Sequence, residues 1–386
     1  MSSIGSNLKE NLDALLRGEA GIGPTRLLET IHRDTLPVGE VALDNGELMD
    51  RLALSRASAS DWSRTALLGL MAAREAYKMA GCSRDDGINT ALVSASTVGG
   101  MDRTEVELSK KDRDPSFIHT HACGDHADRI AAELGIGGYR TALSTACSSG
   151  ANALMHGARL IRSGRAQRVL VGGVDALSRF TLNGFSSLMI LDSEPCRPFD
   201  RSRRGLNLGE GAGFLLLEAE ELALKHPSRI LARLSGYANT NDAYHQTASS
   251  PEGNAAYGAM KEALVSAGLQ VGDVDYINVH GTGTENNDAS EGTAIRRLFG
   301  DIPPALSSTK SFTGHTLGAA AGVEAVFSVL AIREGLIPPS LRFSEPMEGL
   351  DLKPSVEKGR RADLSVVLSN SFGFGGNNSS LCFTAP

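Results

Sequence analysis

The chain lacks the features that mark secreted, membrane-spanning and nucleic-acid-binding proteins. Its 386 residues include only five cysteines at irregular spacing. This spacing is not typical of a disulfide framework, so it favours a reducing cytoplasm. Its net charge of −7 argues against a general nucleic-acid-binding protein, which is usually basic. No signal peptide opens the chain, and the longest apolar-looking helix, residues 317–332, is interrupted by Glu324 and too short to cross a bilayer. We therefore expect a cytoplasmic protein with no nucleic-acid or membrane partner.

Glycine is abundant, at 43 residues, and many glycines end a continuous apolar run. Because these runs do not alternate with polar residues, they predict strands covered on both faces, as in an α/β sheet between helix layers. Residues 65–81 carry apolar side chains at helical spacing and end in glycine, which predicts a helix. The predicted strands are residues 89–97, 167–177, 209–218, 274–284 and 362–376.

A faint internal repeat runs through the sequence. Residues 72–97 resemble residues 259–283: each has a helical pattern, an Ala-Gly end, an acidic turn, an apolar strand and a polar turn. Residues 141–161 likewise resemble residues 304–332. Two similar halves in the same order predict a duplicated α/β unit, with domains at 1–235 and 236–386. No Pro-rich or Ser-rich linker separates them, so we expect one closely packed body.

Residues suited to nucleophilic chemistry lie at the ends of the predicted strands. Cys147, in "TACSSG", precedes a helical stretch; alone, it fits a buried core cysteine as well as a nucleophile activated at a helix N-terminus. The second half has His280 in "HGTGT", Lys310 in "SSTKS" and His315 in "GHTLGAA". In parallel sheets, ligands bind at the carboxyl ends of strands. Four such residues at matching strand ends favour an active site over four separate structural roles.

With these motifs and "NSFGFGG" (370–376), the chain resembles the β-ketoacyl-[acyl carrier protein] synthases of the elongating Cys-His-His type. Two further stretches, residues 197–218 and 241–254, also look like this family. The resemblance implies a thiolase-like fold, in which two βαβαβαββ halves form a five-layer α-β-α-β-α body, and a homodimer. It implies an acyltransferase of fatty-acid elongation. Such an enzyme condenses an acyl group with malonyl-acyl carrier protein and releases a β-ketoacyl-carrier protein, CO2 and free carrier.

The resemblance also implies the role of each site residue. Cys147 would accept the acyl group, and its N–H would hold the tetrahedral oxyanion together with the N–H of Phe374. His280 and His315, both neutral, would donate to the enolate formed by decarboxylation, because an imidazolium is costly in a dry pocket. Lys310 would support them, paired with Glu324. No metal or cofactor is expected, since phosphopantetheine arrives on the carrier.

Mobile and docking elements are implied as well. A gate over the acyl tunnel would consist of Phe372, Gly373, Phe374, Gly375 and Gly376. Asp242 would anchor a second mobile loop, and Val98 and Met101 would line the tunnel. An acidic carrier helix would dock on basic residues, for which the candidates are Lys110, Lys111, Arg113, Arg203 and Arg204, with Arg56 and Arg64 behind them.

The chain departs from the family pattern in three places. The strand and Gly-Pro turn that open the family are absent before "MSSIGSNLKENLDALL", and we expect that the chain starts late. The gate motif ends in "GGNN", where the family usually has threonine before asparagine. The docking face is also less basic than usual.

Two motifs are set aside. "HTHACGDH" (119–126) resembles a metal site, but without paired-cysteine spacing its histidines are expected to be structural. "GEGAG" (209–213) precedes a strand, whereas a dinucleotide loop precedes a helix. Cys82, Cys123, Cys196 and Cys382 are interpreted as packing residues.

Three alternative functions stay open. A thiolase-type acyltransferase would need a second cysteine near the C-terminal glycine loop, but Cys382 lies in an apolar strand. A chain-length-factor subunit, a non-catalytic partner, typically lacks the nucleophile, whereas this chain keeps Cys147. An enzyme of a specialised polyketide or aryl-polyene pathway would keep every catalytic residue.

Overall fold

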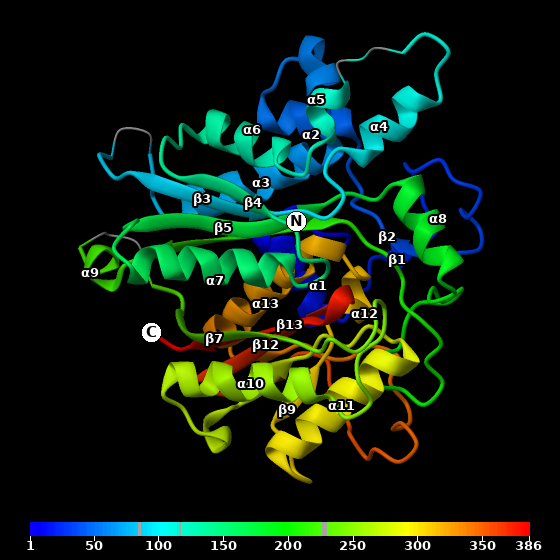
Figure 1. Cartoon of the computed structure of the whole chain (residues 1–386), viewed down its shortest axis with the longest axis vertical. Helices are drawn as coiled ribbons and strands as arrows, with labels where there is room; N and C mark the ends of the chain where they lie inside the picture. The colour runs from blue at the N-terminus through cyan, green and yellow to red at the C-terminus, as the bar shows by residue number, and fades with distance from the viewer. Residues whose placement is uncertain (84–85, 114, 116, 226–229) are drawn as a thin grey trace.

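The computed structural model describes residues 1–83, 86–113, 115, 117–225 and 230–386. Two large β-sheets alternate with three layers of helices, which is the five-layer thiolase-like arrangement that the resemblance implied (Figure 1). The outer and central helices are α3 (Arg64–Met79) and α6 (Asp125–Leu134) on one side, α7 (Ser149–Arg162) and α13 (Ala320–Glu334) between the sheets, and α10 (Asn254–Ala267) and α11 (Glu285–Phe299) on the other side.

The two sheets have related strand orders. The first is β4-β3-β5-β6 and the second is β7-β13-β12-β8-β9; in each, the last strand of the half pairs antiparallel with the strand before it. The first sheet contains β3 (Thr90–Ala95), β4 (Arg140–Leu143), β5 (Arg168–Asp175) and β6 (Gly211–Glu218). The second contains β7 (Arg233–Asn241), β8 (Tyr276–Asn278), β9 (Ala305–Ser307), β12 (Val366–Gly373) and β13 (Asn377–Thr384).

The second half has the βαβαβαββ order, and the first half has the same order without its first strand. By this correspondence, the missing strand would lie beside β6. Met1 and Ser2 do pair there, since Met1 exchanges two backbone hydrogen bonds of 2.9 Å with Ala212. Among the described residues, no strand continues this pairing, and the edge of β6 borders a groove of about 740 Å³. The domain boundary at 235/236 falls inside β7 and stays a prediction.

The remaining helices and strands are mostly shorter. They are α1 (Leu8–Arg17), β1 (Ile22–Gly23), β2 (Val38–Gly39), α2 (Asn45–Leu52), α4 (Met101–Leu108), α5 (Phe117–His121), α8 (Arg179–Ser187), α9 (Glu220–Ala223), α12 (Lys310–Thr313), β10 (Leu336–Ile337) and β11 (Arg360–Arg361). Among all the described helices, none has the length and the apolar character needed to span a membrane.

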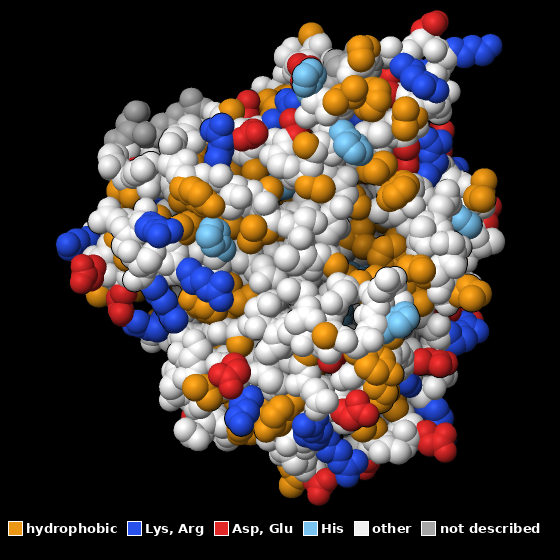
Figure 2. Space-filling model, in the orientation of Figure 1, with side chains coloured by type: hydrophobic (Ala, Val, Ile, Leu, Met, Phe, Trp, Pro, Cys, Tyr) orange, Lys and Arg blue, Asp and Glu red, His pale blue; other side chains and the backbone are white. Residues whose placement is uncertain are grey.

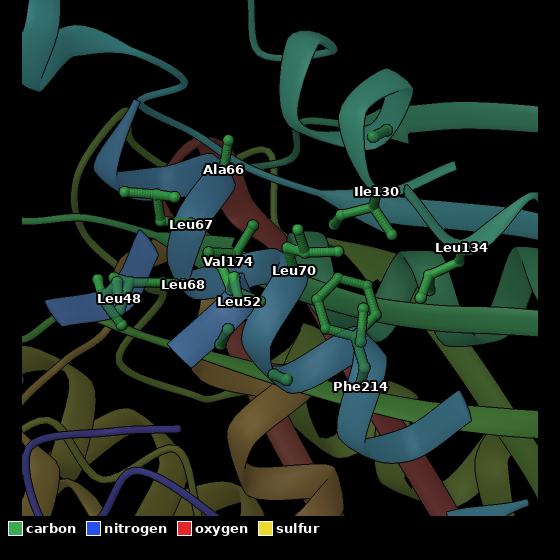
Figure 3. Packing of buried hydrophobic residues seen from close by; sticks show 14 of the residues in the cluster. Leu48, Leu52, Ala66, Leu67, Leu68, Leu70, Ile130, Leu134, Val174 and Phe214 are labelled. Atoms are coloured by element: carbon green, nitrogen blue, oxygen red, sulfur yellow. The ribbon is translucent and has the colours of Figure 1, made fainter. Parts of the chain in front are cut away.

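The largest core cluster lies between the first sheet and its outer helices (Figure 3). Leucines of α2 and α3, among them Leu48 and Leu68, pack with Ile130 of α6 and with Val174 and Phe214 of the sheet. Each of these side chains is at most 4% exposed. Their burial accounts for the continuous apolar runs in the sequence, since strands covered on both faces have no polar side.

Two glycines let the central helices approach each other closely. A Cβ on Gly150 of α7 would lie 2.6 Å from the backbone nitrogen of Gly322 in α13, well inside van der Waals contact. Any larger residue would therefore push the two helices apart. This contact matters for the site, because Cys147 precedes α7 and His315 precedes α13.

Candidate active site

Segments from both halves meet at the carboxyl ends of the strands. Cys147 follows β4, His280 follows β8, and His315 lies between α12 and α13. The sulfur of Cys147 and one ring nitrogen of each histidine all lie within 4.8 Å of one another, and all three side chains are buried. The structure thus brings together three residues that lie 133 and 35 positions apart in the sequence.

Cys147 sits in a strained turn under the gate motif. Ala146, directly before it, has a φ of 52°, a left-handed conformation that non-glycine residues rarely adopt. The backbone N–H of Phe374 lies near the Cys147 thiol and favours its thiolate form. Burial raises the pKa of the thiol to about 11, although Lys310 and the Phe374 N–H act in the opposite direction. The expected activation at the helix N-terminus is therefore outweighed by burial while the site is closed.

This balance predicts how Cys147 responds to pH. At pH 7 the protonated thiol dominates, because the pKa lies well above this pH. We expect the iodoacetamide alkylation rate of Cys147, followed by peptide mass spectrometry, to rise about tenfold per pH unit between pH 7 and pH 10. A plateau near pH 8 would mean that the helix end and Lys310 outweigh burial.

Hydrogen bonds define the tautomers of both histidines. His315 Nδ1 accepts the backbone N–H of Leu317 at 3.0 Å, and His280 Nδ1 lies 3.2 Å from the Nζ of Lys310. A lysine ammonium can only donate, so both Nδ1 atoms are acceptors and both Nε2 atoms carry the hydrogen. Burial, followed by the charge of Lys310, lowers both histidine pKa values well below their usual value. Both rings are therefore neutral N–H donors.

Lys310 forms a buried ion pair with Glu324, as the resemblance implied. Its Nζ is bonded to the carboxylate of Glu324 and donates to the His280 carbonyl at 2.7 Å. The two side chains are 1% and 4% exposed. Burial raises the pKa of Glu324 to about 6 against the effect of Lys310. Lys310 thus orients the ring and backbone of His280.

The sulfur and the two ring nitrogens also form a donor set of the kind that a zinc ion takes. The ammonium of Lys310, 3.2 Å from His280 Nδ1, opposes a second cation at this place. The motif at 119–126 forms no such cluster among the described residues. There, His121 bonds Thr104, and buried His126 bonds Ser94.

The gate motif is a hairpin turn between β12 and β13. The Phe374 ring stacks on Phe185 of α8 with centroids 5.9 Å apart, and the Phe372 ring lies 5.7 Å from that of His280. Gly375 and Gly376 have φ values of 82° and 85°, which only glycine adopts without strain.

The second loop touches this gate. The Asp242 N–H donates to the Gly376 carbonyl at 2.9 Å, and its carboxylate accepts the Ser250 N–H at 2.8 Å. The position of Asp242 fits the anchoring role that the resemblance implies.

A cavity of about 360 Å³ lies over Cys147 and both histidines. Phe185, Met189 and Arg204 line it together with the gate. Figure 2 shows hydrophobic side chains gathered right of the centre, beside α8, where the surface is hollowed. Val98 packs in the same cluster as Phe185 but does not line the cavity, and neither does Met101 at the start of α4.

Sequence reasoning missed two buried carboxylates that position the site. Asp175, at the end of β5, accepts N–H groups from Thr97 at 3.0 Å and from Gly318 at 2.6 Å, so it joins the two halves. Glu291 accepts the N–H groups of His280 and Gly281 at 2.9 and 2.8 Å. Both acids are visible in the sequence, but only the fold shows that they are buried and aimed at backbone donors.

The docking candidates differ in accessibility. The Arg203 side chain is only 10% exposed and donates to backbone carbonyls, and Arg64 is buried against Glu210, so neither is available to a partner. Arg204 remains half exposed at the cavity, paired with Asp192. The other candidates are exposed or partly exposed: Lys110, which pairs with Glu107, Lys111, Arg113, and Arg56, which pairs with Asp50.

Comparisons with known proteins cover the whole chain. The family model "Beta-ketoacyl synthase, N-terminal domain" matches residues 1–223, and "Beta-ketoacyl synthase, C-terminal domain" matches residues 231–344. A 3-oxoacyl-[acyl-carrier-protein] synthase 2 of Staphylococcus aureus (strain N315) is 34% identical over 401 residues, with 99% of this chain and 95% of that protein covered. Nodulation protein E of Rhizobium meliloti is 39% identical over 332 residues, with 83% and 82% covered. The solved structure of the ishigamide ketosynthase/chain length factor has a TM-score of 0.94 and 32% identity, with 100% of this chain and 96% of that chain covered.

Proposed function

Because the chain belongs to the β-ketoacyl synthase family, we propose that it elongates an acyl group held on Cys147 with malonyl-acyl carrier protein. It is a 3-oxoacyl-[acyl carrier protein] synthase-like enzyme with a Cys-His-His triad. One observation carries the proposal: the Cys147 sulfur and nitrogens of two neutral, N–H-donating histidines lie within 4.8 Å of one another.

In the first step, the Cys147 sulfur attacks the thioester carbon of an acyl carrier. A new C–S bond forms, the bond to the carrier sulfur breaks, and the thiol proton of Cys147 passes to the departing carrier thiolate. The tetrahedral oxyanion is stabilised by the backbone N–H groups of Cys147 and Phe374. The effect of the Phe374 N–H on the Cys147 thiol, whose pKa it lowers, supports this role because it places the donor near the reacting sulfur.

In the second step, malonyl-carrier loses CO2, and the electron pair of the broken C–C bond passes to an enolate. The Nε2–H groups of His280 and His315 donate to the enolate oxygen without themselves losing a proton. The enolate carbon then attacks the acyl carbon on Cys147. The sulfur leaves as a thiolate and takes up a proton, which completes the cycle and releases the β-ketoacyl-carrier.

We assign the enzyme to fatty-acid elongation, which is supported by the similarity to 3-oxoacyl-[acyl-carrier-protein] synthase 2. A specialised polyketide or aryl-polyene pathway is the second candidate, favoured by the fold match with the ishigamide ketosynthase/chain length factor. In the first case the chain acts as a homodimer, and in the second it pairs with a different subunit. In both, an acidic carrier docks near the cavity, for which Arg204 is the best-placed cation.

The test starts from an acyl-carrier thioester and peptide mass spectrometry. We expect the acyl mass on Cys147, followed by release of CO2 and β-ketoacyl product when malonyl-carrier is added. Saturated straight chains as the best substrates would support fatty-acid elongation, and polyunsaturated chains would support the specialised pathway. Acylation of Cys147 without condensation by the folded protein would contradict a self-sufficient enzyme. No acylation would contradict catalysis and favour a chain-length-factor-like subunit.

A further inference from the structure

Asn377 occupies the position at which the gate motif departs from its usual sequence, and it is the centre of a polar network. Its Oδ1 accepts hydrogen bonds from Ser148 Oγ at 2.6 Å, Asn152 Nδ2 at 2.9 Å and Asn239 Nδ2 at 2.7 Å. Ser148 adjoins Cys147, Asn152 lies one turn into α7, and Asn239 belongs to β7. One side chain thus joins the end of the gate to the start of the nucleophile helix.

Each of the three groups that donate to Asn377 Oδ1 already has a second acceptor. The Ser148 hydroxyl lies 2.7 Å from the Thr145 carbonyl, and Asn152 Nδ2 lies 2.9 Å from the Thr145 hydroxyl. Asn239 Nδ2 lies 2.9 Å from the Ser379 hydroxyl. A serine hydroxyl has a single hydrogen, so Ser148 serves either Asn377 or Thr145 at one time. If Asn377 moves away, no buried donor is left without a partner, which keeps the cost of release low.

Cys147 is covered by the gate. Cys147 is only 6% exposed, and it lines the same cavity as Phe372, Gly373 and Phe374. Other contacts of the gate include the Phe374–Phe185 stack and two backbone bonds to the neighbouring loop, from Gly375 N–H to Gln246 O and from Asp242 N–H to Gly376 O. Two side-chain amides, of Asn241 and Asn378, also donate to the carbonyls of Gly375 and Gly376. Because residues 373–376 and Cys147 line the same cavity, a movement of these residues changes the access of an acyl chain to the sulfur.

We propose that Asn377 is the latch of this gate, a positioning residue that holds residues 373–376 closed over Cys147 through Ser148 and Asn152. Opening passes the Ser148 hydrogen from Asn377 to the Thr145 carbonyl, so the network has two satisfied arrangements. A threonine at this position has a shorter side chain and one hydroxyl, and it cannot serve three donors in the same way. The latch in this chain is therefore tighter than a threonine would make it. The inference rests on the gate that the family resemblance implies, but not on the condensation reaction of the proposed function.

The test measures alkylation of Cys147 by small iodoacetamide and by bulky N-ethylmaleimide, resolved by peptide mass spectrometry. We expect Asn377→Ala to raise the iodoacetamide rate about fivefold and the ratio of bulky to small reagent rates by a similar factor, because removal of the latch favours the open state. Asn377→Thr should lie between Asn377→Ala and wild type. The control is Ser379→Ala, which removes the second acceptor of Asn239 and no contact of the latch, so it should leave both values unchanged or lower them.

A second latch variant, Ser148→Ala, and its combination with Asn377→Ala complete the test. Ser148→Ala should raise both values, but should add little in an Asn377→Ala background, because both changes break the same contact. Unchanged rates in folded Asn377→Ala would overturn the latch, as would an equal increase in Ser379→Ala. Alkylation needs no carrier, so failure of the latch is distinguishable from failure of the proposed condensation.

Discussion

Replacing His315 with alanine will lower the condensation rate by about two to three orders of magnitude, because loss of one preorganised oxyanion donor typically has this effect. Acylation of Cys147 should stay within about threefold of wild type, since that oxyanion is held by backbone N–H groups instead. His315 is the cleaner of the two histidines to remove. Its Nδ1 only accepts the N–H of Leu317, whereas removal of His280 also deprives Lys310 of an acceptor.

Two measurements separate this role from a structural one. Burst acylation by mass spectrometry and CO2 release from malonyl-carrier are followed in the same variant, and only CO2 release should collapse. The matched control is His156→Ala. His156 is a partly exposed histidine of α7 whose ring contacts Tyr139, so its removal should leave both rates unchanged. Equal losses in acylation and CO2 release would show that His315 acts on the thiol rather than on the enolate.

The pH profile of the wild-type enzyme is a second consequence of neutral histidines. Burial lowers the pKa values of both His280 and His315 well below the usual value, so neither changes charge between pH 6 and 8. Neither histidine should therefore contribute an inflection to the CO2-releasing step near pH 6.5, where an unperturbed histidine titrates. Glu324 does titrate in this range, because burial raises its pKa to about 6, so the profile is compared with that of Glu324→Gln. A rise in activity through this pH that persists in Glu324→Gln would mean that an imidazolium must lose its proton first.

The sequence was sufficient to predict the elements that carry a periodic or continuous apolar pattern. The helix expected at 65–81 is α3, and the strands expected at 89–97 and 167–177 are β3 and β5. The strand expected at 274–284 is only Tyr276–Asn278. The residues just beyond Asn278 are mostly apolar or small because they are buried in a turn, whose N–H groups bind Glu291. A hydrophobicity pattern cannot distinguish such a buried turn from a strand.

The site was predictable where a motif carries a reacting group, and not where a residue acts through burial. Cys147, His280 and His315 stand in short motifs, and the fold brings them within 4.8 Å. Asp175 and Arg203 show the limit of such reasoning. A buried acid that binds backbone N–H groups and a buried arginine that donates to carbonyls look like surface charges in a sequence, because their environment comes from segments far along the chain.

The second large effect concerns stability. Lys310→Met leaves the Glu324 carboxylate buried without its cation, and breaking a buried pair in this way costs about 3–5 kcal/mol. In the wild type, burial already raises the pKa of Glu324 to about 6. In the variant, the folded state favours the protonated form of Glu324 even more strongly than the wild-type folded state does. The folded state then binds more protons than the unfolded state, so stability falls as pH rises. The loss of stability of Lys310→Met relative to wild type, measured as the shift of the urea midpoint, should be largest above pH 7 and should shrink toward pH 5.

The double variant Lys310→Met, Glu324→Met distinguishes a stabilising pair from a positioning one. Because two apolar side chains replace both charges, it should recover stability to within about 1 kcal/mol of wild type. Condensation should remain impaired, since His280 Nδ1 and its carbonyl have lost the donor that orients them. As a control, Lys9→Met breaks an exposed pair with Asp13 and should not shift the urea midpoint measurably. Full recovery of condensation in the double variant would mean that the pair only holds the fold, and that the orientation of His280 is set by Glu291 instead.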